Sequence, residues 1–380
     1  MTFFNAPDFW SIPNSLNGKV LAPIGALVSW ITIRRMSRAG KRVGAAVICI
    51  GNPTVGGAGK TPTVIVFLEQ LKRKHARPFA LTRGYGGSLR GPVQVDLSKH
   101  DVRTVGDEAL LLARVAPTIV SHNRLAGAQM AVALGATHIV MDDGFQSPGL
   151  VKNATLLVVD AEAGIGNGLT IPAGPLRARF RDQLERADAL LVVGDGPAER
   201  GLPNSRRKPI LRAHMEPDAE TIKRLFGQNV IAFAGIGRPD KFFNTLTDNG
   251  VHVVQQHAFP DHHPYTVAQV ASMVERAHFR QLKLVTTAKD YARLQRPAFA
   301  AFKDMIEVLP VRLKFDDPTE VDAIIRNAEV RSMLFQPPEP ATPVETPAEP
   351  QAAAGTETPP AEPAQPTPPP QPVQTGPFTG

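Results

Sequence analysis

The sequence predicts an α/β protein in which a doubly wound, mainly parallel sheet is followed by a second, smaller α/β lobe. Three observations support this fold class. From Ala45 onward, short apolar runs alternate with helical stretches, which is the pattern of parallel α/β architecture. A glycine-rich stretch stands between the first apolar run and the first helical stretch. After Phe335 the composition changes to one that cannot form a core.

Residues 43–215 form the first predicted domain. Its expected strands are AAVICI, PFALTRG, TIVS, HIVMDD, TLLVVD and ALLVV. Its expected helices are GKTPTVIVFLEQLKRK, DEALLLARVA and RLAGAQMAVALG. Ligands of such folds bind beyond the carboxyl ends of the strands, and most of the polar clusters described below fall there.

Residues 216–335 form the second predicted domain, after the Pro- and Arg-rich passage GPAERGLPNSRRKPILRAHM. Its expected strands are NVIAFAGI, VHVVQQ, LKLVTT and EVLPVRL. Its expected helices lie near DKFFNTL and YTVAQVASMVERA. Because strands and helices alternate again, we expect a smaller α/β lobe rather than an all-helical extension.

Residues 336–380 form a tail that is expected to be disordered and partly polyproline-like. The tail carries fifteen of the 36 prolines, five glutamates, no Lys or Arg, and Phe378 as its one aromatic residue. Removing its five negative charges from the formal net charge of +7 leaves about +12 on the body. Such a basic body is typical of proteins that bind phosphate, nucleic acid or an anionic membrane.

The single cysteine, Cys49, excludes a disulfide framework and a cysteine-ligated metal site. It lies in the apolar run before the glycine-rich stretch. A reducing, cytoplasmic setting fits this cysteine usage.

Residues 1–42 are predicted to associate with a membrane. The apolar run Val20 to Ile33 is followed by RRMSRAGKR rather than by a small-residue cleavage site, so it is not an ordinary signal peptide. Its fourteen residues are fewer than the roughly 20 that span a bilayer as a helix, so we expect it to lie among the lipid headgroups. The basic residues that would contact lipid phosphates on the cytoplasmic side are Arg34, Arg35, Arg38, Lys41 and Arg42. The alternative is a buried helix with a solvated basic end.

The glycine-rich stretch GNPTVGGAGKTP is predicted to bind the phosphates of ATP. It departs from the pattern G-x-x-x-x-G-K-[ST], because Thr54 stands where the first glycine is expected. Its context between strand and helix is still that of a phosphate loop, since backbone N–H groups at the helix N-terminus point at the anion. Lys60 is expected to reach the β- and γ-phosphates, and the Thr61 hydroxyl to bind Mg²⁺. The predicted nucleotide-binding residues are Thr54, Val55, Gly56, Gly57, Ala58, Gly59, Lys60 and Thr61.

This context makes residues 43–215 a predicted P-loop nucleotide-binding domain. A glycine turn without a ligand is the alternative, but it explains neither the Gly-Lys-Thr triplet nor its position before a helix.

Two acidic pairs lie in the same predicted domain. Asp142 and Asp143 end the apolar strand HIVMDD, where a carboxylate can hold magnesium beside a phosphate loop. Asp107 and Glu108 precede a helix, and phosphoryl transfer to an alcohol needs a carboxylate or a histidine near the hydroxyl. Helix capping is the alternative for both pairs.

The segment FPDHHPY of the second domain presents His262 and His263 in a turn bounded by prolines. A carboxylate that orients an imidazole would make it a base for a hydroxyl nucleophile. A transition-metal site that also uses His257 is an alternative, but the ligands crowd one turn and no cysteine joins them. Three arginines flanked by glycine, proline or polar residues are candidates for phosphate contact, namely Arg83, Arg124 and Arg177.

Taken in order, these motifs resemble the tetraacyldisaccharide 4′-kinase family of lipid A biosynthesis. The motifs that carry the resemblance, between Ile12 and Phe335, are GNPTVGGAGKTP, LTRGYGG, VGDEALLLA, MDDGFQ, IPAGPLR, FAGIGRPDKFF and FPDHH. The resemblance implies ATP-dependent phosphorylation of the 4′-hydroxyl of a tetraacyldisaccharide 1-phosphate lipid. It also implies two α/β lobes with the active site between them, and a membrane-associating N-terminal helix at the cytoplasmic face of the bacterial inner membrane.

Position by position, the resemblance implies three sets of site residues. The catalytic residues are Lys60, Asp107 and His262, with Asp107 and His262 together activating the sugar hydroxyl. The residues expected to bind Mg²⁺ are Thr61, Glu108, Asp142 and Asp143. The residues expected near the nucleotide or the disaccharide are Tyr85, Arg124, Gln146, Arg177 and His263. Ser147 stands where the family usually has histidine, so no role is carried to that position. Ala178 stands where the family usually has glutamate, which removes one possible polar contact.

The main rival is a membrane-tethered P-loop ATPase that acts as a switch or a partitioning protein. Such proteins carry an extra lysine where this chain has Val55, and the chain also lacks the N-K-x-D guanine motif of G proteins. A small-molecule kinase or ligase of similar fold leaves the N-terminal segment unexplained. Neither nucleic acid nor an obligate protein partner is expected.

Overall fold

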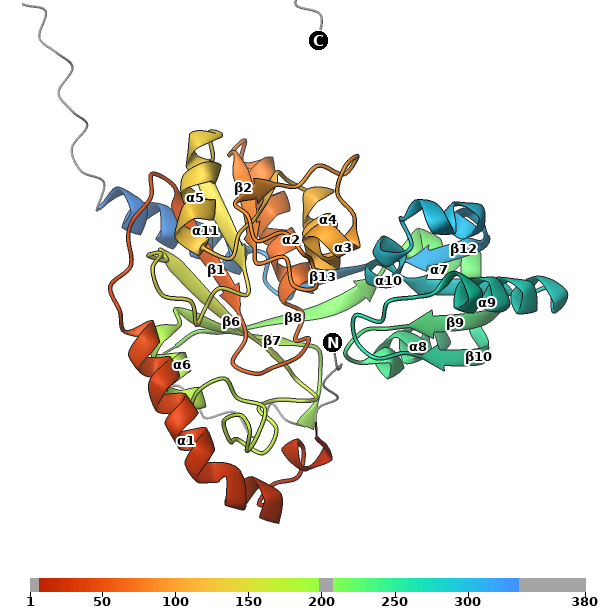
Figure 1. The fold of residues 1–380 in the computed structure, drawn as a ribbon, viewed down its shortest axis with the longest axis horizontal. Coiled ribbons are helices and arrows are strands. Elements are labelled where there is room, and N and C mark those ends of the chain that lie inside the picture. The colour runs from red at the N-terminus through yellow and green to blue at the C-terminus, as the bar shows by residue number, and fades with distance from the viewer. Residues whose placement is uncertain (1–6, 198–207, 335–380) are drawn as a thin grey trace, which may run out of the picture. The chain divides into compact units, whose positions relative to one another are not determined.

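The computed structural model of the protein describes residues 7–197 and 208–334. The predicted tail, residues 336–380, lies outside the described residues. Most strands of the larger sheet are parallel, and helices cover both of its faces, so the predicted α/β class is confirmed (Figure 1). In sheet order its strands are β13 (Val311–Phe315), β8 (Ile210–Pro217), β7 (Ala189–Val193), β6 (Ala154–Asp160), β1 (Ala46–Gly51), β5 (His138–Asp142), β2 (Pro78–Thr82), β4 (Thr118–Val120) and β3 (Val93–Gln94).

Strand β1 lies at the centre of this sheet and pairs in parallel with β5 on one side and β6 on the other. The chain first builds the β5 side and then the β6 side, so its direction across the sheet reverses beside β1. Such a reversal opens a crevice at the carboxyl ends of the strands, where doubly wound folds bind ligands. The phosphate loop follows β1 directly and therefore lies at that crevice.

The larger sheet has a hydrophobic core on each face because the side chains of β1 alternate. Ile48 and Ile50 pack into one core, whereas Val47 and Cys49 pack into the other. The helices of this part are α2 (Lys60–Arg73), α3 (Val102–Val105), α4 (Asp107–Ala113), α5 (Arg124–Ala133), α6 (Phe180–Arg186) and α11 (Thr319–Met333). Full burial of each large aliphatic or aromatic side chain stabilises the fold by about 1.5–3 kcal/mol.

The smaller sheet is wholly parallel in the described part of the chain. In sheet order its strands are β10 (His252–Ala258), β9 (Asn229–Ala234), β11 (Lys283–Thr287) and β12 (Ile306–Leu309). Its helices are α7 (Ala219–Leu225), α8 (Pro239–Asp248), α9 (Val267–Phe279), α10 (Ala288–Arg293) and the 3₁₀ segment η3 (Pro297–Met305). The expected second α/β lobe is therefore present.

Sheet membership differs from the predicted lobe boundaries of 216–335 at the C-terminal end. The expected single strand EVLPVRL is two strands: β12 belongs to the smaller sheet, and β13 pairs antiparallel with β8 in the larger one. Pro310 separates them because it has no N–H for a sheet hydrogen bond. Phe315 then packs against Phe67 of α2, with ring centroids 6.3 Å apart, and α11 packs on β1. Residues 311–334 thus belong with the larger sheet.

The N-terminal helix α1 (Leu16–Met36) follows a 3₁₀ turn, η1 (Asp8–Trp10). It has 21 residues and extends the fourteen-residue apolar run at both ends, so the expectation that this segment is too short to cross a bilayer is corrected. Within the described residues, α1 is long and apolar enough for a membrane span, by length and composition alone. The side chain of Ser15 caps its first turn by accepting a hydrogen bond from the Gly18 N–H.

Only a narrow face of α1 packs on the rest of the protein. A Cβ atom on Gly25 would lie 2.5 Å from the carbonyl oxygen of Thr170, so this close approach requires glycine. Ser29 accepts a hydrogen bond of 2.9 Å from the backbone N–H of Arg179. The exposed apolar side chains on the helix are Leu16, Val20, Ile24, Leu27, Trp30 and Ile31.

Candidate active site

The phosphate loop joins β1 to α2, and the space next to two of its glycines is free of other protein atoms. Gly59, the residue before α2, has φ 89°, and Gly56 has φ 115°, both in the region that favours glycine. No atom lies within 4 Å of the position that a Cβ would take on Gly56 or Gly57. The loop therefore presents open backbone at a helix N-terminus, which is the geometry of an anion site.

Neighbouring segments hold this loop from beneath. The Val55 N–H donates to the carbonyl of Pro175, and the Arg177 N–H donates to the carbonyl of Pro53, both at 2.8 Å. The Arg177 side chain adds a bond of 3.1 Å to the Thr54 carbonyl. The loop lacks the first glycine of the usual pattern, and these hydrogen bonds from neighbouring segments hold its backbone in place.

Gln146 also contacts the loop region. Its amide donates to the Asn52 carbonyl at 3.0 Å and to the Gln183 side chain at 2.9 Å. Asn52 in turn donates to the Gly56 carbonyl at 3.0 Å, as Lys60 does at 3.3 Å. The expected contacts of Gln146 and Arg177 with a ligand stay predictions, and both residues position the phosphate loop.

A set of oxygen donors lies where Mg²⁺ is expected. The Thr61 hydroxyl donates to Asp142 Oδ2 at 3.0 Å. Asp142 Oδ1 and Asp143 Oδ1 are buried and have no hydrogen-bond partner in the described part of the protein. Burial raises the pKa of Asp142 to about 7, assisted by the negative charge of Glu108. Two unsatisfied carboxylate oxygens beside a hydroxyl fit a hard divalent cation.

The backbone at the end of β5 is held by Arg124. Its buried guanidinium donates to the carbonyls of Asp142 and Asp143, each at 3.1 Å. Asp143 has φ 52°, an uncommon conformation for a residue with a side chain, and its carboxylate pairs with Arg177 at 2.9 Å. A contact of Arg124 with a ligand stays a prediction, since the structure uses this side chain on the backbone that presents the acidic pair.

The structure brings Asp107 and His262 together from the two sheets' helices and loops. Asp107 begins α4, after Gly106 with φ 85° and ψ 160°, where a Cβ would lie 2.3 Å from the Tyr85 carbonyl oxygen. Only glycine adopts this conformation without strain. His262 has φ 57°, and its Nδ1 lies 3.0 Å from Asp107 Oδ2.

The two neighbouring histidines have different surroundings. The ring of His262 lies 5.1 Å from the ring of Tyr85, which is 66% exposed. The His263 ring stacks on Phe259 at 4.7 Å, and its Nε2 lies 3.2 Å from the Gln269 side chain. His262 therefore faces Asp107, whereas His263 is engaged within the smaller lobe.

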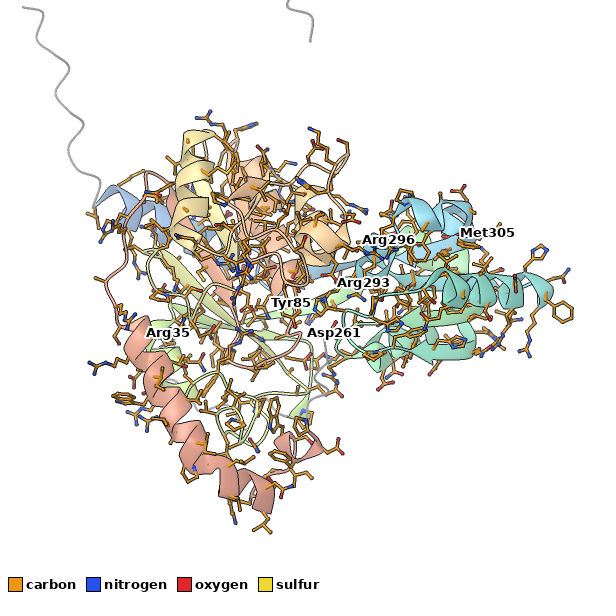
Figure 2. All side chains as sticks on the ribbon, viewed as in Figure 1. Arg35, Tyr85, Asp261, Arg293, Arg296 and Met305 are labelled. Carbon is orange, nitrogen blue, oxygen red and sulfur yellow. The ribbon has the colours of Figure 1, made fainter. Side chains whose placement is uncertain are left out.

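Sequence reasoning missed two cations of α10 at this site, Lys289 and Arg293. The Lys289 ammonium lies 3.6 Å from Glu108, 3.5 Å from Asp261 and 3.3 Å from Nε2 of His262. Arg293 bonds to Asp107, and α10 packs against α4. Figure 2 labels Arg293, Tyr85 and Asp261 in the region where the two sheets approach each other. The segment TTAKDYAR held a signal, because charged residues begin a helix directly after a buried strand.

These cations keep Asp107 ionised although it is only 2% exposed. Burial alone would raise its pKa, but the charges of Lys289 and Arg293 and the hydrogen bond from His262 hold the pKa below the ordinary value. A carboxylate only accepts hydrogen bonds, so Nδ1 of His262 carries the proton in this contact. The Lys289 ammonium lies 3.3 Å from Nε2 and can donate to it, and the Asp261 carboxylate lies 3.7 Å from the same nitrogen.

A second contact between the lobes surrounds Asp160, at the end of β6. Its carboxylate pairs with Arg238 at 2.8 Å and with Lys241 at 2.5 Å. Arg238 also pairs with Glu162. We call these four residues the Asp160 cluster, and the set Asp107, His262, Lys289 and Arg293 the Asp107 cluster. Next to Arg238, Gly237 approaches the phosphate loop: a Cβ on it would lie 3.7 Å from the Gly57 nitrogen.

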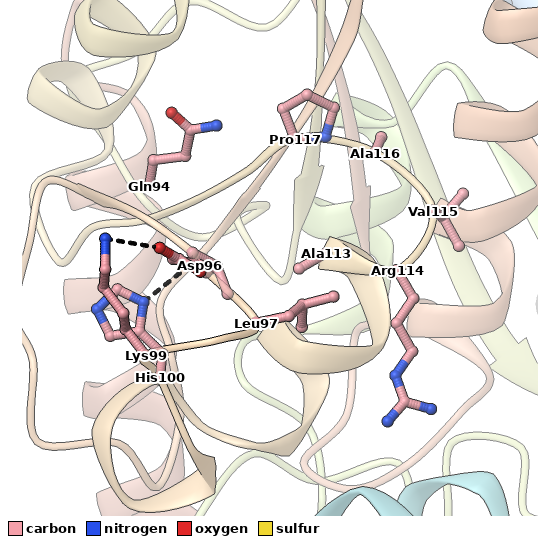
Figure 3. A pocket seen from close by; sticks show the side chains of 11 residues that line it. Gln94, Asp96, Leu97, Lys99, His100, Ala113, Arg114, Val115, Ala116 and Pro117 are labelled. Atoms are coloured by element: carbon pink, nitrogen blue, oxygen red, sulfur yellow. Dashed lines mark hydrogen bonds and ion pairs between the residues drawn. The ribbon is translucent and has the colours of Figure 1, made fainter.

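A surface hollow of about 740 Å³ lies elsewhere, between residues 94 and 117 (Figure 3). None of its lining residues is a predicted site residue. Asp96 is already engaged there, since it pairs with Lys99 at 3.0 Å and its N–H donates to Nδ1 of His100. The hollow therefore has no part in the site.

Comparisons with known proteins identify the family of the chain. A family model described as "Tetraacyldisaccharide-1-P 4'-kinase" matches residues 18–329. Relatives named tetraacyldisaccharide 4'-kinase include those of Azorhizobium caulinodans, 52% identical over 86% of this chain and 98% of the relative, and Xanthobacter autotrophicus, 52% identical over the same two shares. The relative from Bradyrhizobium diazoefficiens is 47% identical over 84% of this chain and 95% of its own length.

A solved structure supports the fold. The crystal structure of an "apo" form of LpxK from Aquifex aeolicus in complex with ATP matches with a TM-score of 0.64. It is 24% identical and covers 82% of this chain and 99% of its own. The resemblance carried by the motifs is confirmed by the family match and the curated relatives, and the chain belongs to the tetraacyldisaccharide-1-P 4'-kinase family.

Proposed function

We propose that the protein transfers the γ-phosphoryl group of ATP to the 4′-hydroxyl of a tetraacyldisaccharide 1-phosphate, a lipid A precursor. The observation that carries this proposal is the contact of 3.0 Å between His262 and Asp107, beside an open phosphate loop. Phosphoryl transfer to an alcohol uses a phosphate site and a carboxylate or histidine near the hydroxyl, and this arrangement offers both. Family membership supports the identity of the lipid acceptor.

The proposed proton acceptor is Nε2 of His262. As the sugar oxygen bonds to the γ-phosphorus, the hydroxyl proton passes to Nε2, and the bond between the γ-phosphorus and the bridging oxygen breaks to leave ADP. Asp107 accepts the hydrogen bond from Nδ1 and stabilises the imidazolium that forms. Lys289 occupies the region of Nε2 here, so the incoming hydroxyl takes its place.

Charge on the transferring group is balanced by the loop. Backbone N–H groups of Gly56 to Lys60 and the Lys60 ammonium face the phosphates. Mg²⁺, when bound, would neutralise the charge on the β- and γ-phosphate oxygens. The residues proposed to hold it are Thr61, Asp142, Asp143 and Glu108. Among residues 7–197 and 208–334 no three His, Cys, Asp or Glu side chains form a metal cage, so phosphate oxygens and water would complete the ligands.

The lipid substrate is proposed to arrive through the membrane surface. Helix α1 keeps its apolar side chains exposed and ends in basic residues such as Arg34 and Arg35. Such a helix binds bilayers through apolar burial and attraction to anionic headgroups. The proposed location is the cytoplasmic face of the bacterial inner membrane, where ATP is available.

The test is transfer of labelled γ-phosphate from ATP to the purified disaccharide lipid. The purified protein with Mg²⁺ should label the lipid without nucleic acid or another protein, and Lys60→Ala should abolish the transfer. A switch or partitioning ATPase would instead hydrolyse ATP at a rate that the lipid does not change, and the lipid would stay unlabelled. That result would overturn the proposal.

A further inference from the structure

We infer that Arg293 is the positioning residue of the Asp107–His262 pair, because one buried guanidinium fixes both members. The inference rests on the proposed function and extends it to a residue of α10. Arg293 does not touch the phosphate loop in any contact of the described residues. It acts through the two residues that would handle the hydroxyl proton.

The first half of the guanidinium holds Asp107. Nε and NH2 of Arg293 both donate to Asp107 Oδ2, at 2.8 and 2.6 Å. The same oxygen accepts the bond from Nδ1 of His262 at 3.0 Å. Asp107 Oδ1 accepts the Glu108 N–H at 2.9 Å, so both oxygens are fixed. The carboxylate can therefore present Oδ2 to the imidazole in one orientation only.

The second half of the guanidinium holds the loop that carries His262. NH1 of Arg293 donates to the Gly235 carbonyl at 2.6 Å and to Asp290 Oδ1 at 2.7 Å. The Gly235 carbonyl also accepts the backbone N–H of His262 at 3.1 Å. Arg293 and the backbone of His262 thus share one acceptor, the Gly235 carbonyl. The position of the imidazole therefore depends on the position of the guanidinium.

Asp290 fixes the guanidinium itself. It is fully buried and accepts hydrogen bonds from the Gly235 N–H at 2.9 Å, the Tyr265 hydroxyl at 2.8 Å and the Thr287 hydroxyl at 2.6 Å. Side-chain exposures of 4% for Arg293 and 2% for Asp107 exclude water from the pair. The orientation thus passes from Asp290 through Arg293 to Asp107 within one connected network.

A buried ion pair adds little net stability compared with apolar packing, so stability alone is a weak reason for this network. The planar guanidinium of Arg293 carries donors on two edges. One edge donates to Asp107, and the other donates to Gly235 and Asp290. A lysine has one ammonium group and cannot serve both sides. Arg293→Lys therefore keeps the charge and removes the shared positioning.

The test compares kcat and KM of the full chain in detergent with the disaccharide lipid as acceptor. Arg293→Lys should lower kcat about 100-fold, as expected for a reacting group displaced by about 1 Å, and should leave KM for ATP within about twofold. The matched control is Arg296→Ala, three residues along the chain, whose guanidinium lies over the Phe299 ring at 5.1 Å. It should keep wild-type kcat.

A double-mutant cycle with His262→Ala separates positioning from a general structural role. In the His262→Ala background, Arg293→Lys should lower kcat by less than about twofold further, because the pair that Arg293 positions is already broken. Independent losses that multiply, a raised KM for ATP with unchanged kcat, or wild-type kcat in Arg293→Lys would each overturn the inference.

If Arg293→Lys does not unfold cooperatively, the variant is not properly folded, and the same double-mutant cycle with His262→Ala is measured with Asp290→Asn in its place. Asp290→Asn keeps Arg293 but weakens the hydrogen bond that orients its guanidinium. The variant should therefore lower kcat by less than Arg293→Lys does, and this loss should vanish in the His262→Ala background. Loss in both backgrounds would overturn the inference. Failure of the wild type to label the lipid would instead contradict the proposed function, so the two failures are distinguishable.

Discussion

The Asp107 cluster and the Asp160 cluster both join a carboxylate of the larger lobe to cations of the smaller lobe, yet their surroundings differ. Arg293 and Asp107 are almost fully buried. Asp160 is also nearly buried, at 11% side-chain exposure, but its partner Arg238 is 31% exposed and Glu162 is 51% exposed. Removing one partner of a buried pair leaves an uncompensated charge, but an exposed pair is readily replaced by water and salt. The comparison supports the proposal that the Asp107 cluster fixes catalytic geometry, and it predicts that the Asp160 cluster only tunes contact between the lobes.

The largest expected effect breaks the Asp107 cluster at His262. His262→Ala should lower kcat for lipid phosphorylation by about 10²- to 10⁴-fold, the usual contribution of a positioned acid or base. The Kd for ATP should stay near wild type, because His262 does not contact the phosphate loop. The matched control is His263→Ala, whose ring packs on Phe259; equal losses in the two variants would contradict the different roles of the two histidines.

Asp107→Ala should next distinguish the two clusters by stability. It removes one of the two carboxylates that pair with the buried Arg293 and leaves Asp290 as the other, so the free energy of unfolding should fall by about 3 kcal/mol in denaturant titrations. Arg238→Ala should lower the same quantity by at most about 1 kcal/mol. Similar losses at the two sites would show that burial does not separate them.

Asp142 provides a third contrast, because it is buried and keeps an unsatisfied oxygen, whereas Asp107 is bonded on both oxygens. Its pKa of about 7 lies above the ordinary 3.8, so without metal the folded state holds this proton more tightly than the unfolded chain does. This contribution to stability is full below pH 4 and is lost as the pH rises through 7.

Asp142→Asn should therefore stabilise the metal-free protein at pH 8 by a few kcal/mol, on the order of 1.4 kcal/mol per unit of pKa shift. The gain should vanish near pH 4, and it should be measured by denaturant unfolding in EDTA. Asp143→Asn is the control, since it loses the ion pair with Arg177 and gains no such stability. A pH-independent difference between Asp142→Asn and wild type would contradict the raised pKa.

The smallest expected effect concerns salt and the Asp160 cluster. Because the partners of Asp160 are partly exposed, high salt should weaken the cluster. The small difference in unfolding free energy between wild type and Arg238→Ala should therefore shrink from about 0.05 M to about 1 M NaCl. The corresponding difference for Asp107→Ala should change much less. A salt-insensitive Arg238→Ala effect would place this cluster among the buried pairs.

Local patterns predicted much of the fold and the site. The glycine-rich loop between β1 and α2, the acidic pair at the end of β5 and the alternation of strands and helices are short-range signals, and the structure has these segments at the expected places in the fold. The ligand roles of the loop and of the acidic pair stay predictions. The role of Pro310 as a switch between sheets could not be predicted, because strand EVLPVRL is one apolar run and only the partners β8 and β11 divide it. The length of α1 was underestimated, because only its apolar run was counted.

Contacts between residues far apart in the chain could not be predicted either, because they depend on tertiary packing. Arg293 lies 186 positions from Asp107, and nothing in TTAKDYAR states which carboxylate its guanidinium meets. Likewise, the turn FPDHHPY offers two equivalent histidines until the packing of Phe259 occupies one of them. Spacing identifies the residue types that a site needs, whereas tertiary packing selects which of them meet.

Transfer of labelled γ-phosphate to the purified tetraacyldisaccharide 1-phosphate, by wild type and His262→Ala side by side, is the most direct measurement. The wild type should label the lipid in an Mg²⁺-dependent reaction, and His262→Ala should bind ATP with similar affinity while labelling the lipid at least about 100 times more slowly. An unlabelled lipid with ATP hydrolysis that ignores it, or equal labelling by the two proteins, would contradict the proposed kinase site.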